Sequence, residues 1–118
     1  AVQIGTAFLR NNDSKISDPH RRALAGAGDE STRVTRLHSG KPARAIRNRL
    51  MNDLADAEHQ IAPYPSQRTL VAPLAKVGEG ESQALWAGQN VGLTQEIDAA
   101  ELVRKLGEET SARLKAFA

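Results

Sequence analysis

The sequence opens with Ala1-Val2-Gln3-Ile4-Gly5-Thr6-Ala7-Phe8-Leu9, a nearly continuous run of apolar and β-prone residues. Such a run is typical of a strand buried on both faces, which occurs mostly in parallel sheets covered by helices. A parallel strand needs hydrogen-bonding neighbours, but the only other candidate is Thr32-Arg33-Val34-Thr35-Arg36-Leu37, a short alternating stretch that is either a strand or an extended segment. The chain also lacks an initiator methionine. It is either a processed or truncated polypeptide or one numbered from an internal residue, and we expect a fragment with further strands upstream.

Length and composition favour one helix-rich domain. A chain of 118 residues suits a single domain, and its many alanines and few aromatics favour close helix packing. The absence of cysteine excludes a disulfide framework and a thiolate metal site. No stretch approaches the roughly 18 apolar residues that a membrane helix needs. We therefore expect a cytoplasmic protein with no membrane partner and no metal site.

The residues after the opening run predict mainly helices. Local signals mark where they begin and end: capping side chains, prolines, glycines and apolar residues at helical spacing. The first predicted helix is capped by Ser17 or Asp18, has Pro19 in its first turn and ends at Gly26 or Gly28; the second covers Ala43–Ala57. The third is capped by Ser66, after the break Pro63-Tyr64-Pro65, and the fourth begins at Asp98, with Glu101 completing a capping-box-like start.

Gln3-Ile4-Gly5-Thr6 is the first candidate site. A glycine at the carboxyl end of a buried strand lets the backbone approach a ligand, and the following threonine adds an amide and a hydroxyl that suit a phosphate group. In eight-fold barrels, the phosphate site commonly follows the last two strands. A bulge or bend is the structural alternative, because buried strands often end in glycine for that reason.

Two further segments are candidates. Ser39-Gly40-Lys41-Pro42-Ala43-Arg44, followed by Arg47-Asn48-Arg49, concentrates positive charge. Three interpretations are open: a solvated helix start with local ion pairs, a site for an acidic group of a cofactor or substrate, or a contact with nucleic-acid phosphates. The aromatic residues that stack on bases are absent here, which argues against binding of single-stranded nucleic acid. In Leu85-Trp86-Ala87-Gly88-Gln89-Asn90, the tryptophan is either a core residue or a pocket wall.

The three histidines share no metal-ligand spacing. His20 and His59 fall on polar helical positions and are expected to be exposed, and His38 is the one to watch as a proton carrier. No catalytic triad, P-loop or dinucleotide fingerprint is present.

Taken in order, five segments resemble the flavin-dependent nitronate monooxygenases, formerly called 2-nitropropane dioxygenases. The ordered set is specific although each motif alone is weak or moderate, and the resemblance covers nearly the whole chain. The similar segments are Ala1–Leu9, Ser39–Arg44, Arg47–Arg49, Ala62–Pro65 and Leu85–Asn90.

The resemblance implies an α/β fold in which residues 1–118 are the C-terminal portion of a single TIM-type (β/α)8 barrel domain that binds FMN without a covalent bond. Residues 1–9 would be a late barrel strand, and residues 10–118 the mostly helical remainder. By the family pattern, Gln3, Ile4, Gly5 and Thr6 would meet the flavin phosphate. The family's catalytic histidine would lie upstream of Ala1, so no residue of this chain is assigned a catalytic role.

The activity implied is oxidation of alkyl nitronates by molecular oxygen to a carbonyl compound and nitrite. The expected partners are the small nitronate, oxygen and the upstream remainder of the same barrel, and this chain alone is expected to be inactive. The first alternative is an FMN-dependent NAD(P)H:quinone or enoyl-thioester reductase on the same scaffold. The second is a basic helical module that binds nucleic acid, which a two-sided buried strand would argue against.

Overall fold

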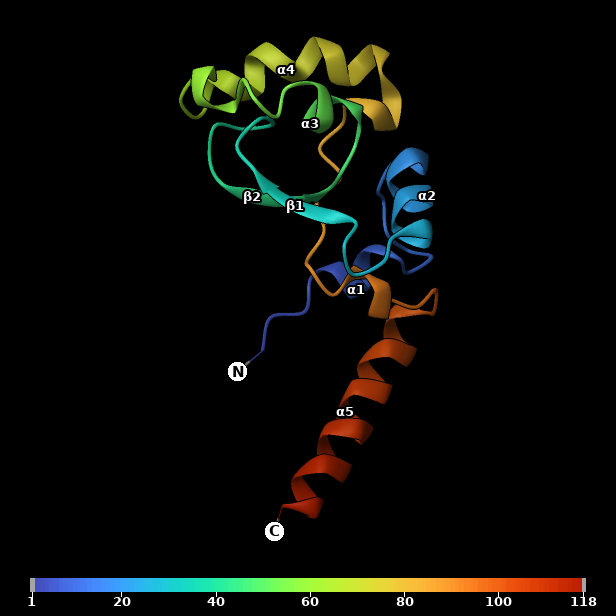
Figure 1. Ribbon diagram of the computed structural model, residues 1–118. Helices are drawn as coiled ribbons and strands as arrows, with labels where there is room; N and C mark the ends of the chain where they lie inside the picture. The colour runs from blue at the N-terminus through green and yellow to red at the C-terminus, as the bar shows by residue number, and fades with distance from the viewer. Residues whose placement is uncertain (1, 118) are drawn as a thin grey trace.

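The computed structural model describes residues 2–117, which form an elongated, helix-rich α/β molecule of about 52 × 28 × 24 Å (Figure 1). The longest helix, α5, extends away from the rest of the molecule. The elements are α1 (Thr6–Leu9), α2 (Asp18–Gly26), β1 (Thr32–Thr35), β2 (Ala43–Ile46), α3 (Arg49–Asp53), α4 (Ser66–Val77) and α5 (Ala99–Ala116), with 3₁₀ turns at Glu58–Gln60, Glu79–Glu81 and Val91–Leu93.

The sheet is a small antiparallel one. β1 pairs with β2 in a register that places Arg33 opposite Ala45. Residues 85–87 run along the free edge of β2: the amide of Ile46 donates to the carbonyl of Leu85 at 2.8 Å, and Ala45 forms an antiparallel bridge with Trp86. The sheet therefore fixes the chain immediately before Gly88.

The strand predicted for residues 1–9 is wrong over its described part. Val2 to Gly5 have no regular structure, and Thr6–Leu9 form the short helix α1; Ala1 lies outside the described residues. Val2 is 86% exposed and Ile4 is 39% exposed, so this end of the run is not buried. The physical reason is that β1 and β2 pair with each other, and no strand among residues 2–117 lies beside the opening run to satisfy its backbone groups.

The helix predicted for Ala43–Ala57 is confirmed only over Arg49–Asp53 and is wrong for the residues on either side. Ala43–Ile46 form β2, and the helix begins only at Arg49, after Asn48. The Asn48 side chain accepts a hydrogen bond from the amide of Met51 and so caps α3. Ile46 and Leu50 are both buried in the observed strand followed by a helix. Their spacing is also that of one helix face, so it did not distinguish this arrangement from one continuous helix.

The predictions for α2 and α5 are confirmed, and of the two alternatives left open for Thr32–Leu37 the structure shows the strand. Ser17 caps α2 by accepting from the amide of His20, with a proline at the helix start. β1 occupies the first four residues of the predicted alternating stretch. The Asp98 carboxylate accepts from the amides of Ala100 and Glu101 at 2.8 and 3.2 Å, as its capping position predicts.

Two apolar clusters hold the body together. Leu24, Ile46, Leu85, Ala87 and Val91 form one cluster, with α2 packed against the sheet. Leu37, Ala45 and Met51 form the other, with Ile61 against them. The apolar residues of α5 are mostly outside both clusters: Leu102 is buried, whereas Val103, Leu114 and Phe117 are exposed. None of the helices in residues 2–117 has the length and apolar character that crossing a membrane requires.

Candidate functional site

A hollow of about 750 Å³ lies between the opening segment, the chain after the sheet and the first half of α5. Gln3, Ile4, Gly5 and Thr6, the residues predicted to meet a cofactor phosphate, all line it. Gly88, Gln89 and Asn90, from the segment whose tryptophan was considered as either a core residue or a pocket wall, line the facing side. The structure thus brings together two segments that the sequence separates by more than 80 residues.

One hydrogen bond joins these two segments directly. The amide of Gly88 donates to the Thr6 hydroxyl oxygen at 2.7 Å. A Cβ on Gly88 would lie 3.3 Å from the same hydroxyl oxygen, which is tighter than ordinary packing. Gly88 therefore permits a close approach that a larger residue would strain, and the bond sets the width of the hollow at this point.

Gly5 lies at the start of α1 with open space around it. A Cβ built on Gly5 would meet no atom within 4 Å, so nothing among residues 2–117 crowds this position. Gly5 precedes the first helical residue of α1 and provides no side-chain cap for its amides. The first amides of a helix lack acceptors within the helix, so they are available to a ligand or to water.

Two side chains from the end of α1 hold the third wall in place. A guanidinium nitrogen of Arg10 donates to the carbonyl oxygen of Thr94 at 2.8 Å. The Asn11 amide nitrogen donates to the carbonyl oxygen of Ile97 at 2.6 Å, and this side chain is almost fully buried. These contacts fix the loop that leads into α5, and with it the face of α5 that borders the hollow.

Sequence reasoning missed the residues that α5 and its preceding loop contribute to the hollow. Gln95, Leu102, Lys105, Leu106 and Glu109 all line it. On a helix, positions three or four apart share a face, so the α5 residues could have been grouped from spacing alone. Nothing in the sequence, however, indicated which segment that face would meet.

Trp86 lies outside the hollow and belongs to a neighbouring aromatic contact. Its ring meets the His38 ring edge-on, with the centroids 5.4 Å apart. Burial lowers the pKa of His38, and its Nε2 has no hydrogen-bond partner. His38 is not among the residues that line the hollow, so the structure places the histidine singled out as a proton carrier away from it.

The prediction that His20 is exposed is wrong. His20 is 8% exposed, and its Nε2 lies 3.0 Å from the carbonyl oxygen of Trp86. Burial lowers its pKa, and the contact with that carbonyl opposes the change only in part. In the sequence His20 falls among polar residues of α2, but in the structure its side chain faces the segment that contains Trp86. His59, by contrast, is exposed as predicted.

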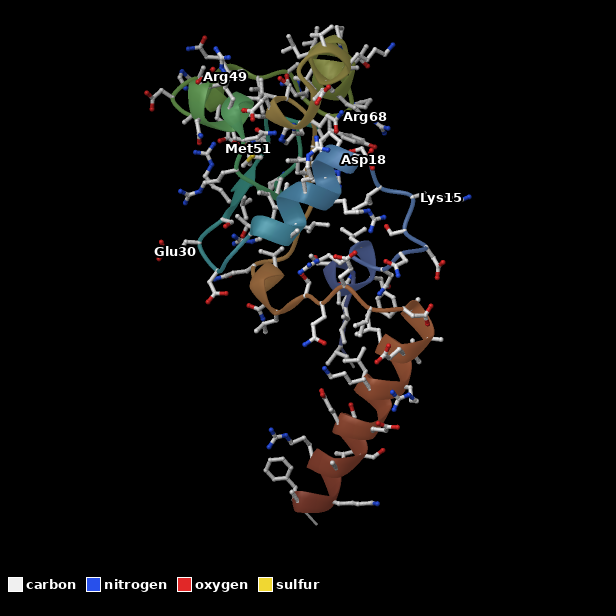
Figure 2. The ribbon with its side chains drawn as sticks, turned by 90° about the vertical axis from the view of Figure 1, so that its right-hand side faces the viewer. Lys15, Asp18, Glu30, Arg49, Met51 and Arg68 are labelled. Carbon is white, nitrogen blue, oxygen red and sulfur yellow. The ribbon has the colours of Figure 1, made fainter. Side chains whose placement is uncertain are left out.

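The basic segment is occupied largely by local contacts. Arg44 donates to the Thr32 hydroxyl oxygen at 3.1 Å. Arg33, which lies outside the segment on β1, likewise donates to the carbonyl oxygen of Met51 at 2.7 Å. Arg49 pairs with Asp53 at 3.1 Å on the surface of α3, where Figure 2 shows Arg49 and Met51 at the same end of the molecule. These contacts favour the structural interpretation of the segment over a nucleic-acid interface.

The Ser39-to-Lys41 turn packs against the Pro63-Tyr64-Pro65 break. Gly40 has φ +90°, and a Cβ there would lie 2.5 Å from the amide nitrogen of Tyr64. The Lys41 ammonium lies 4.4 Å from the centre of the Tyr64 ring, within range of a cation–π contact. Two of the resembling segments therefore form a structural corner and do not border the hollow.

Comparison with known proteins identifies relatives of this chain. A sequence model described as "Nitronate monooxygenase" matches residues 1–109. A probable nitronate monooxygenase of Bacillus subtilis is 36% identical over 113 residues, covering 92% of this chain and 33% of the relative. One of Staphylococcus aureus is 35% identical over 109 residues, covering 89% of this chain and 31% of the relative. The chain therefore spans about a third of the length of the curated relatives it matches.

Solved structures extend the likeness to the fold. The structure described as nitroalkane oxidase from Streptomyces ansochromogenes aligns with a TM-score of 0.84 and 37% identity, covering 98% of this chain and 34% of that one. FabK from Thermotoga maritima aligns with a TM-score of 0.67 and 22% identity, covering 100% of this chain and 40% of that one, a likeness that concerns the fold alone. From the family match and the curated relatives together, we conclude that this chain belongs to the nitronate monooxygenase family.

Proposed function

We propose that the complete protein is an FMN-dependent nitronate monooxygenase that oxidises alkyl nitronates with molecular oxygen to a carbonyl compound and nitrite. In this proposal, residues 1–118 are the C-terminal part of its TIM-type barrel, and Gln3, Ile4, Gly5 and Thr6 hold the flavin phosphate. The family match and the likeness to a nitroalkane oxidase support the activity. The observation that carries the site is the Thr6–Gly88 hydrogen bond, which joins the two segments around one hollow.

The residues around the hollow fit a phosphorylated flavin in size and in donor chemistry. Ligand pockets commonly have volumes of about 300–1,000 Å³, and this hollow of about 750 Å³ falls within that range. The uncapped amides at the start of α1 suit phosphate oxygens. The carboxamides of Gln3, Gln89 and Asn90 can both donate and accept, as the polar edge of a flavin requires.

The chemistry that FMN supplies when bound is the transfer of electrons from the nitronate to oxygen. This chain's own part is binding and orientation: Thr6 and Gly88 set the spacing of the two walls, while Arg10 and Asn11 fix the loop before α5. The proton-transferring group is proposed to lie in another part of the complete protein, because no histidine of the described residues lines the hollow.

The activity is tested on the purified full-length protein with propyl-3-nitronate, by following oxygen consumption and nitrite formation. Nitrite formed in step with substrate loss, without added NADH or NADPH, is the expected result. An FMN-dependent NAD(P)H:quinone or enoyl-thioester reductase on the same scaffold is the second candidate. Fast NADH oxidation with a quinone, and no nitrite, would establish that reductase instead.

The site is tested separately by substituting Thr6. Thr6→Val removes the acceptor for the Gly88 amide, whereas Thr6→Ser retains it. A neutral hydrogen bond contributes about 0.5–1.5 kcal/mol, so Thr6→Val should weaken FMN binding by roughly 2- to 10-fold, and Thr6→Ser should bind nearly as the wild type. Thr69→Val, at an exposed position on α4, is the matched control. Equal FMN affinity in Thr6→Val and the control would remove Thr6 from the site.

A further inference from the structure

The face of α5 that borders the hollow carries opposite charges one turn apart. Leu102, Lys105, Leu106 and Glu109 are spaced so that they share this face, and all four line the hollow. Leu102 is buried at its base, which anchors the face against the body. Lys105 and Glu109 are the two charged residues among those that line the hollow in the described part of the chain.

The Lys105 ammonium is held by a neutral group. Its Nζ donates to the side-chain oxygen of Gln95 at 2.9 Å, across from the helix to the preceding loop. None of the ion pairs formed within residues 2–117 includes Lys105, although Glu109 follows it at the i+4 position where helical ion pairs commonly form. The positive charge is therefore positioned without a carboxylate to neutralise it, and an ammonium with three N–H groups retains donors for a ligand.

The loop that positions Lys105 is itself tied to the opening segment. Gln95 follows Thr94, whose carbonyl oxygen accepts from Arg10 at the end of α1. One connected set of contacts thus runs from α1 through the loop to Lys105. The Lys105 ammonium and the polar groups of Gln3 to Thr6 line the same hollow, and an ammonium suits an anion with several oxygens.

We propose that Lys105 supplies the positive charge with which the hollow selects a phosphorylated flavin over its unphosphorylated form. The inference rests on the proposed function and adds to it a specificity-determining residue outside the Gln3-to-Thr6 segment. Lysine binds phosphate as a compact point charge, so neutralising it removes affinity for the phosphate but not for the ring system. Glu109, on the same face, opposes the binding of an anion.

The test compares FMN with riboflavin on the flavin-free full-length protein, with binding followed by quenching of flavin fluorescence. Lys105→Gln is expected to weaken FMN binding by roughly 10- to 100-fold, the range of a charge-assisted hydrogen bond, and to change riboflavin binding by less than about twofold. Lys105→Arg keeps the charge and should recover much of the loss. Glu109→Gln should strengthen FMN binding alone, by roughly 2- to 5-fold for a removed surface repulsion.

Arg104→Gln provides the matched control. Arg104 is the adjacent exposed cation on α5, pairs with Glu108 at 2.8 Å and does not line the hollow. Its substitution should leave both affinities unchanged, which separates a local effect of Lys105 from a general loss of positive charge. Raising the salt concentration should reduce the ratio of FMN to riboflavin affinity in the wild type more than in Lys105→Gln, because salt screens the attraction between the Lys105 ammonium and the phosphate.

The outcomes distinguish this inference from the proposed function. Lys105→Gln with unchanged FMN affinity, or with FMN and riboflavin weakened equally, would overturn the role of Lys105 while the wild type still binds FMN. An Arg104→Gln loss equal to that of Lys105→Gln would overturn it as well. A wild-type protein that binds neither flavin would overturn the proposed function and this inference together.

Discussion

Substitutions of Asn48 test which hydrogen bonds hold the chain segment that leads to the hollow. Its side chain is 8% exposed and forms three hydrogen bonds at once. The amide nitrogen donates to the carbonyl oxygens of Gly80 at 3.0 Å and Gln83 at 2.8 Å, while the amide oxygen accepts from the amide of Met51 at 3.2 Å. One carboxamide therefore caps α3 and also ties it to the turn that precedes Leu85.

The expected cost of Asn48→Ala follows from these contacts. Losing a helix cap costs about 1 kcal/mol. Each of the two carbonyl oxygens loses a bond that contributes about 0.5–1.5 kcal/mol, and water replaces it in part because Gly80 and Gln83 are half-buried. The free energy of unfolding should therefore fall by about 2–4 kcal/mol, measured by urea denaturation of the full-length protein.

Asn48→Asp separates the cap from the two donated bonds. The carboxylate can still accept from Met51 but sets a negative oxygen against two carbonyl oxygens, so at neutral pH the loss should at least equal that of Asn48→Ala. Asn12→Asp, at an exposed position, is the control and should change stability by less than about 0.5 kcal/mol. An Asn48→Asp protein as stable as this control would refute the assignment of the two donated bonds.

Three further predictions concern other parts of the fold. Gly40→Ala places a Cβ on a residue with φ of +90° and within 2.5 Å of the Tyr64 amide nitrogen, so the free energy of unfolding should fall by more than about 2 kcal/mol. Gly107→Ala is the control, because a Cβ there meets nothing within 4 Å. A fall no larger than in this control would contradict the close packing at Gly40. Asp98→Ala removes the cap of α5 and should cost about 1 kcal/mol in urea denaturation, while Asp98→Asn should cost much less. Burial lowers the pKa of His20 and of His38 below the ordinary value of 6.5. As the pH falls, these histidines therefore bind protons in the unfolded chain at a higher pH than in the folded protein. The free energy of unfolding should fall as the pH drops below about 6.5 and level off below the folded-state pKa values. His38→Gln should flatten that decline between pH 7.5 and 5.5, and an unchanged slope in both His38→Gln and His20→Gln would show that neither histidine is responsible.

The candidate site was predictable in part from the sequence. Gln3-to-Thr6 and Leu85-to-Asn90 were each identified as segments of interest, and both contribute to the hollow. Their meeting through Thr6 and Gly88 could not be predicted, because a contact between residues 82 positions apart leaves no local signal. Lys105 was not singled out for the same reason: within its own helix, nothing local marks it as different from the other lysines of the chain.

What the sequence by itself determined were the elements whose signals are local. Ser17 and Asp98 mark the starts of α2 and α5 because a cap acts within three residues of itself. The ordered motifs likewise indicated the family, and the matching relatives confirm it.

Only the tertiary structure decided the elements whose backbone groups need distant partners. Ala43–Ile46 became β2, not helix, because β1 and the Leu85 segment supply its hydrogen bonds. Val2 to Gly5 did not become a strand, since no strand among residues 2–117 lies beside them. A helix satisfies its own backbone, whereas a strand depends on neighbours that the local sequence does not name.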